Sequence, residues 1–331
     1  MSRKQVRRAR RWRKTLLFSP LLAMVAIPAT IFSGILTSTT TTTTTSTTTT
    51  TLPYVPPPVP ATLPGGAGTS SWINPEPWSG STPSILTTSF PISPTLQGYA
   101  AWIRSTSTSI GLYPGYKGPG PLRINRGPMM VPVVARPYLL ATFNSGFYEE
   151  DTAAGFYSHH TAFYPMVNGR ATLVTYTDGR VDVLTWTSGQ VIPATIGTAR
   201  QNLNLLVENH HATSATIATP YMWGSTLHGL PKVWRSGVGV DDHGNLLYVA
   251  APDQSAASLA AIFVRLGAVR AMEMDINPVW PIFVTYGARG GLLPVLRVSN
   301  PNQTARRFLY SSTKDFYAVY LRSATTVQVP W

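Results

Sequence analysis

The segment from Val269 to Asp275 (VRAMEMD) carries two carboxylates, Glu273 and Asp275, separated by one residue. In a β-strand alternate side chains point to the same face, so these two would project together from Cα atoms about 6.6 Å apart. Glycosidases use two carboxylates about 5 to 9.5 Å apart, one as the acid and the other as the base or nucleophile. The spacing is therefore compatible with glycosidase chemistry. The structural alternative is an Asx turn from Asp275 into Ile276-Asn277-Pro278, with Glu273 paired locally.

Two further side chains could bind a substrate. Arg235 lies just before Gly237 in WRSGVGV, and its guanidinium could hold a phosphate or a carboxylate with two hydrogen bonds. A surface salt bridge is the equally acceptable interpretation of Arg235. Asn144 ends a predicted strand in TFNSGF, where small neighbours allow a ligand to approach the backbone.

The histidines and cysteines give no support to a metal centre. The adjacent pairs His159-His160 and His210-His211 would point to opposite faces of an extended chain. The sequence has no cysteine, which excludes thiolate zinc sites, iron–sulfur clusters and a cysteine nucleophile. It also has no HExxH, P-loop, GxSxG or GxGxxG motif. We therefore expect neither a metal nor a cofactor.

The net charge of +13 is concentrated at one end of the chain. Residues 1–14 hold eight basic side chains and no acid, and the remainder carries 18 basic against 13 acidic groups. A nucleic-acid-binding domain would carry its excess of positive charge on the folded part. Nucleic acid is therefore not an expected partner.

An uncharged stretch follows the basic end. Residues 16–36 are long enough to span the hydrocarbon core of a membrane as a helix. The positive charge before them puts a tail of residues 1–15 in the cytoplasm and everything after residue 36 outside the cell. A cleaved signal peptide is the alternative, but its apolar region is usually shorter. We expect a single-pass protein of the cell membrane with an extracellular C-terminal domain.

Residues 37–95 have the composition of a stalk. They begin with a run of Thr and Ser and continue with PYVPPPVP and a Gly-rich stretch. Such segments lack the apolar side chains that drive packing and resemble extended spacers. The globular domain is expected from residue 96 to residue 331.

The composition of this domain favours short strands joined by tight turns. Asp-Gly in TDGR separates 171–176 from 181–186, and DDHGN separates 237–241 from 246–251, so both pairs are predicted hairpins. A further strand is expected at 203–207.

Leu259, Ile262, Phe263 and Leu266 form one apolar helical stripe, with Ser255 as N-cap and Gly267 at the C-terminal end. Strand, helix and strand in this order predict a βαβ unit with two parallel strands. The expected class is therefore α+β, with a mixed sheet.

Four segments, taken in order, resemble the phosphodiester glycosidase family, the bacterial relatives of the lysosomal enzyme that uncovers phosphate by removing N-acetylglucosamine from a phosphodiester. They are FNSGFY at 143–148, ARQNLNLLV at 199–207, RSGVGV at 235–240, and the stretch from Ser258 to Asp275. The family's N-L-D-G-G motif reads Glu273-Met274-Asp275-Ile276-Asn277 here, so Asp275 is kept and both glycines are replaced. This form is similar to a membrane-anchored branch of the family.

The resemblance implies an exported, membrane-tethered glycosidase-like protein that hydrolyses a sugar phosphodiester, for example in cell-envelope glycans. It implies Asp275 as the acid/base carboxylate and Glu273 as its partner. Arg235 would hold the phosphate, while Asn144 and Asn277 would bind the substrate. The alternative hypothesis is a non-catalytic domain that binds or organises envelope glycans and keeps the fold without the activity.

Overall fold

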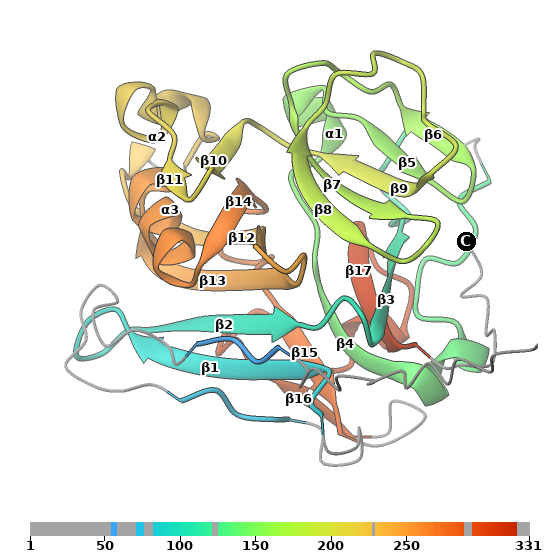
Figure 1. The fold of residues 1–331 in the computed structure, drawn as a ribbon, viewed down its shortest axis with the longest axis horizontal. Helices are drawn as coiled ribbons and strands as arrows, with labels where there is room; N and C mark the ends of the chain where they lie inside the picture. Colours follow the sequence, from blue (N-terminus) through green and yellow to red (C-terminus); the bar gives the residue numbers. More distant parts are fainter. Residues whose placement is uncertain are drawn as a thin grey trace, which may run out of the picture. The chain divides into compact units, whose positions relative to one another are not determined.

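The computed structural model describes residues 54–57, 71–75, 82–120, 125–226, 229–287 and 293–322 (Figure 1). The predicted basic tail (1–15), the predicted anchor (16–36) and most of the predicted stalk lie outside these residues. No helix within the described ranges is long and apolar enough to cross a membrane.

The largest element is a seven-stranded sheet in which all neighbouring strands are antiparallel. In spatial order its strands are β1 (Ile85–Pro91), β2 (Gln97–Ile103), β13 (Leu246–Gln254), β12 (Val233–Asp241), β14 (Ala268–Glu273), β10 (Leu205–Glu208) and β11 (His211–Ala212).

Two five-stranded antiparallel sheets complete the β-structure (Figure 1). One has the order β16 (Pro294–Leu296), β15 (Phe283–Tyr286), β4 (Leu139–Asn144), β17 (Phe316–Leu321) and β3 (Thr108–Tyr113). The other has the order β6 (Thr161–Tyr164), β5 (Phe156–Ser158), β9 (Ile196–Gln201), β7 (Ala171–Tyr176) and β8 (Val181–Thr185).

The helices in the described ranges are short. They are α1 (Glu149–Thr152), α2 (Ala215–Ala218) and α3 (Ala256–Arg265), with 3-10 turns at η1 (Val133–Tyr138), η2 (Pro220–Met222) and η4 (Arg307–Leu309). The fold is therefore mostly β, rather than an even mixture of helix and strand.

The predicted mixed sheet is wrong. Strand β13, helix α3 and strand β14 follow one another as expected, but β12 lies between the two strands and pairs antiparallel with both. The physical reason is the tight turn after β12, which makes β13 its hairpin partner and leaves the opposite edge of β12 for β14. The crossover through α3 therefore spans one intervening strand. Strands β13 and β14 run in the same direction, as predicted for the βαβ unit, but they are not hydrogen-bonded to each other.

Several local predictions are confirmed. The hairpins β7–β8 and β12–β13 form at the predicted turns. Helix α3 begins after Ser255, whose hydroxyl accepts a hydrogen bond of 3.1 Å from the amide of Ser258. Gly267 follows this helix with a φ of +84°, a left-handed conformation that glycine adopts without strain.

The folded part begins before residue 96. Strand β1 lies inside the predicted stalk and pairs along its whole length with β2. Ile73 forms a β-bridge with Thr87, and Tyr54 and Trp72 pack against buried side chains beside α3. The segment ILTTSF is rich in apolar and β-branched residues, and this β-propensity outweighs the polar composition around it.

A shared core joins the three sheets, and α3 covers the other face of the largest one. The core contains Phe143 of β4, Leu173 of β7 and Val238 of β12. On the opposite face Phe263 of α3 is fully buried against the sheet. Gly237 of β12 allows this close approach, since a Cβ atom there would lie 2.8 Å from the Phe263 ring and 2.7 Å from the Met272 carbonyl oxygen.

We expect Gly237→Ala to lower the free energy of unfolding by about 1 to 3 kcal/mol, because the added methyl group overpacks the contact between the sheet and α3. Urea unfolding of both proteins measures this loss. Gly197→Ala in β9 is the control, since its nearest contact would be an ordinary 3.4 Å. Equal stability of Gly237→Ala and the wild type would contradict this account of the packing.

Candidate functional site

The antiparallel pairing of β12 and β14 continues past the last residue of β14. The amide of Met274 donates to the Ser236 carbonyl at 2.8 Å, and the amide of Ser236 donates to the Asp275 carbonyl at 3.0 Å. The hydroxyl of Ser236 donates to the same Asp275 oxygen at 2.8 Å. The backbone at Asp275 is therefore fixed to the neighbouring strand.

The four segments that carry the family resemblance meet at this point. Asn144, at the end of β4, donates to the Ser236 hydroxyl at 2.9 Å. Asn202, which directly follows β9, donates to the Glu273 carbonyl at 2.7 Å. Segments that are far apart in the sequence thus converge on the end of β14.

Asn144 is a structural residue in this arrangement. Its side chain is buried, and its carbonyl oxygen accepts hydrogen bonds from the Tyr248 hydroxyl at 2.8 Å and from the Ile282 amide at 3.1 Å. Its amide group donates to the carbonyl of Ser145 at 2.9 Å as well as to Ser236. Both polar groups of the Asn144 side chain are therefore engaged by the protein itself.

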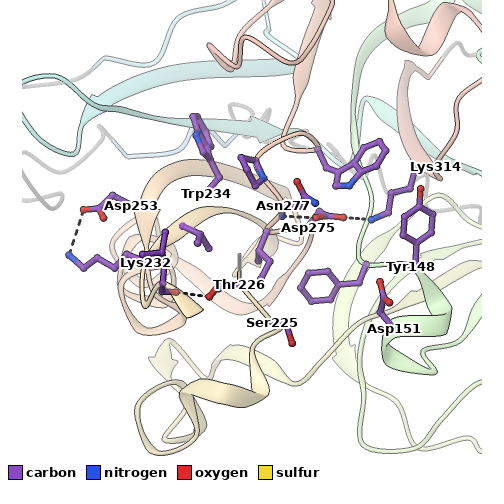
Figure 2. A pocket seen from close by; sticks show the side chains of 16 residues that line it. Tyr148, Asp151, Ser225, Thr226, Lys232, Trp234, Asp253, Asp275, Asn277 and Lys314 are labelled. Carbon is purple, nitrogen blue, oxygen red and sulfur yellow. Dashed lines mark hydrogen bonds and ion pairs between the residues drawn. The ribbon is translucent and has the colours of Figure 1, made fainter. Parts of the chain in front are cut away.

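A cavity of about 530 Å³ opens beside Asp275 (Figure 2). Of the residues predicted for the site, Asp275 and Asn277 line it, whereas Glu273, Arg235 and Asn144 do not. The lining residues include aromatic, apolar and charged side chains: Phe147, Tyr148, Asp151, Ser225, Thr226, Leu230, Lys232, Val233, Trp234, Asp253, Asp275, Ile276, Asn277, Pro278, Trp280 and Lys314.

Glu273 and Arg235 form an ion pair that is sealed from the cavity. The side chains of both residues are almost completely buried. The guanidinium of Arg235 also donates to the carbonyl oxygens of Gln254 at 2.9 Å and Trp223 at 3.0 Å. Arg235 therefore binds parts of its own chain, and the structure does not present it to a phosphate in the cavity.

Asp275 forms the second buried ion pair, with Lys314 (Figure 2). Its other carboxylate oxygen accepts a hydrogen bond of 2.9 Å from the amide of Asn277, which is the Asx turn considered from the sequence. Burial raises the pKa of the Asp275 carboxyl, while Lys314 and the Asn277 amide act in the opposite direction. Asp275 is thus a buried carboxyl group that lines a cavity and is held beside a cation.

Two aromatic rings surround the Lys314 ammonium. It lies 4.6 Å from the centroid of Tyr148 and 5.3 Å from that of Trp280, and the rings meet edge to face. The guanidinium of Arg307 lies over Trp280 at 4.7 Å. Rings of this kind can stack on the apolar face of a sugar and also stabilise a neighbouring cation.

Lys314 was not predicted from the sequence. It lies in the loop before β17, and the next residue, Asp315, pairs with the buried Arg200 at 2.8 Å. Arg200 also pairs with Glu149 at 3.0 Å, next to the cavity residue Tyr148. One feature of the sequence could have indicated Lys314. It and Asp315 are adjacent charged residues directly before the apolar strand FYAVYL, in a chain in which only 12% of the residues are charged.

No group of three or more His, Cys, Asp or Glu side chains that could hold a metal ion occurs within the described residues. His210 pairs instead with Asp242 at 3.0 Å on the surface.

No known family profile matches the sequence, and no curated protein matches it. Several solved structures are similar in fold. The catalytic domain of zebrafish N-acetylglucosamine-1-phosphodiester alpha-N-acetylglucosaminidase, auto-inhibited by its pro-peptide, has a TM-score of 0.49 and 15% identity, over 78% of this chain and 90% of that chain. A hypothetical protein from Synechocystis has a TM-score of 0.45 and 14% identity, over 77% of this chain and 64% of that chain.

A Burkholderia pseudomallei protein described as exported has a TM-score of 0.39 and 12% identity, over 73% of this chain and 75% of that chain. These similarities concern the fold alone.

We expect the stability of the protein to depend on Glu273 between about pH 4.5 and about pH 7. Burial raises the pKa of its carboxyl from 4.5 to about 7 despite the neighbouring Arg235. Because the folded state binds this proton more tightly, the stabilisation is complete below the unfolded pKa and is lost as the pH rises through the folded pKa. Glu273→Gln should reduce this loss by up to about 3 kcal/mol.

Urea unfolding at a series of pH values across this range measures the effect. Part of the pH dependence should remain in Glu273→Gln, because burial also raises the pKa of Glu149 to about 7. Asp178→Asn is the control: hydrogen bonds from Arg180 lower the pKa of the exposed Asp178, so its titration falls below this window. An unchanged pH dependence in Glu273→Gln would rule out a raised pKa for this group.

Proposed function

We propose that this protein hydrolyses a sugar phosphodiester in the cavity beside Asp275, with Asp275 as the proton donor. The observation that carries the proposal is a buried carboxyl group with a raised pKa that lines a cavity next to the cation Lys314. A raised pKa suits a general acid near neutral pH. The resemblance of the four sequence segments to the phosphodiester glycosidase family supports the same reaction.

In the proposed reaction the bond between the anomeric carbon and the phosphate oxygen breaks, and its electron pair stays on that oxygen. The oxygen takes the proton of Asp275. A water molecule then supplies a hydroxyl group to the anomeric carbon and returns its other proton to the Asp275 carboxylate. The products are the free sugar and a phosphate monoester, and Asp275 is restored to its protonated form.

The position of Glu273 changes its proposed role. Glu273 is paired with Arg235 behind the cavity wall. In this proposal it fixes the position of β14 and does not contact the substrate. Asn277 remains a candidate for contact with the substrate, since it lines the cavity. Arg235 and Asn144 are assigned to support of the site.

We also propose that the domain is exported and tethered to the cell membrane through residues 16–36, with envelope glycans as its substrates. The basic residues before this uncharged stretch and the Thr-rich segment after it support that arrangement.

Asp275→Asn should lower kcat for a sugar 1-phosphodiester by about 100-fold to 10,000-fold, the usual contribution of a general acid. Release of reducing sugar measures the rate. In ¹⁸O-labelled water, absence of the label from the phosphate monoester shows that the bond to the anomeric carbon was cleaved rather than the bond to phosphorus. Asp178→Asn in the β7–β8 turn is the matched control and should keep the wild-type rate. Equal rates for Asp275→Asn and the wild type would remove Asp275 from the mechanism.

A non-catalytic glycan-binding domain is the second candidate. The observation that favours it is the absence of Glu273 from the cavity lining, which leaves Asp275 without the carboxylate partner expected from the sequence. Saturable binding of a sugar phosphodiester without turnover by the wild type would select this function over hydrolysis.

A further inference from the structure

Lys314 occupies an unusual position, because its ammonium group joins the buried carboxylate to the cavity. It forms the ion pair with Asp275, lies against the rings of Tyr148 and Trp280, and also lines the cavity. The side chain is only 5% exposed, so both partners of the pair are desolvated. Because Asp275 lines the same cavity, a ligand there would lie next to both members of the ion pair.

The other cations near the cavity are less suited to bind an anion within it. Lys232 lines the cavity, but its side chain is 55% exposed and lies 3.6 Å from Asp253. Arg235 is used by its own chain, as described above. Arg307 stacks on Trp280, donates to the Gln303 side chain at 2.6 Å and does not line the cavity.

We propose that Lys314 binds the anionic phosphate of the substrate and in doing so gives up its ion pair with Asp275, which then takes a proton. The inference rests on the proposed function and deepens it. The arrival of the anion itself would convert Asp275 from a paired carboxylate to the neutral acid that the reaction needs.

The physical basis is the balance of charges around a buried carboxyl group. Lys314 and the Asn277 amide favour the ionised form of Asp275, whereas burial and the neighbouring Asp315 favour the protonated form. The other titratable groups that face it are Tyr148, Arg307 and Glu273.

A phosphodiester carries one negative charge at neutral pH. When the Lys314 ammonium binds this charge, its attraction for the Asp275 carboxylate becomes weaker. The negative phosphate also repels the carboxylate. Both changes raise the affinity of Asp275 for a proton.

A specificity follows from this coupling. A glycoside with a neutral leaving group would leave the ion pair between Lys314 and Asp275 intact, and Asp275 would stay ionised. The site would then discriminate against ordinary glycosides through the charge of the leaving group rather than through its shape.

The test uses dimethyl phosphate, which is a monoanion at neutral pH and has no sugar to hydrolyse. We would titrate it into the full-length protein in detergent micelles by calorimetry at pH 7, in two buffers with different ionisation enthalpies. The wild type should bind with uptake of up to one proton. Asp275→Asn should bind without this uptake, and Lys314→Met should lose at least 10-fold in affinity.

Matched variants keep the test independent of folding. Lys232→Met removes the exposed lysine of the same cavity and should lower the affinity far less than Lys314→Met does, with proton uptake retained. Lys314→Arg should restore binding, because it keeps the positive charge. The double variant Asp275→Asn with Lys314→Met has neither charge of the ion pair, so no unpaired buried charge destabilises its fold. A loss of binding in this variant therefore reports the missing ammonium rather than unfolding.

Binding of dimethyl phosphate by Lys314→Met with wild-type affinity would overturn the inference, and so would binding to the wild type without proton uptake or no binding at all. Failure of the proposed function is recognised separately. In that case the wild type would take up the proton with dimethyl phosphate but release no sugar from any phosphodiester.

Discussion

The carbonyl oxygen of Asp275 accepts hydrogen bonds from both the amide and the hydroxyl of Ser236, and the site depends on this contact. It extends the pairing of β12 and β14 for one further step before the chain turns. The Asx turn to Asn277 then directs the chain along the cavity. Asn144 holds the Ser236 hydroxyl, and Asn202 holds the end of β14, so three separate segments stabilise one short stretch of backbone.

Around this backbone the buried charges are grouped so that each has a partner. Glu273 pairs with Arg235, Asp275 with Lys314, and Arg200 with both Glu149 and Asp315. Removal of one member of such a group would leave an uncompensated buried charge, which is strongly destabilising. The difference between the groups lies in their exposure to the cavity. Asp275 and Lys314 reach it, whereas Arg235 and Glu273 are enclosed by the protein.

The sequence was most informative where the structure is local. The two hairpins, helix α3 and its Ser255 cap follow from turn chemistry and from the spacing of apolar residues along short stretches. The place of Asp275 just after a strand also follows from local sequence. By contrast, the position of β12 between β13 and β14 depends on which edge of β12 each strand occupies, and no residue in either strand encodes that choice by itself.

The surroundings of the predicted site residues are likewise not encoded locally. Glu273 and Asp275 are two residues apart, but their surroundings come from different parts of the chain, since Arg235 lies in β12 and Lys314 lies before β17. Alternation along a strand predicts the face of the sheet to which a side chain points. It does not predict which side chain from another segment it will contact there. For this reason the sequence alone presents Arg235 as a candidate ligand for phosphate. It gives no link between Asp275 and Lys314, which lies more than 30 residues further along the chain.

The two sides of the cavity differ in how firmly they are held. Tyr148 and Lys314 each adjoin a residue that Arg200 binds, so one guanidinium inside the protein sets the position of both. Ser225, Leu230 and Lys232 are instead exposed residues that precede β12 in the chain. Substitutions on that side disturb few buried contacts. Homologous proteins could therefore differ in the ligand groups that they recognise on that side, while the wall formed by Tyr148 and Lys314 stays the same.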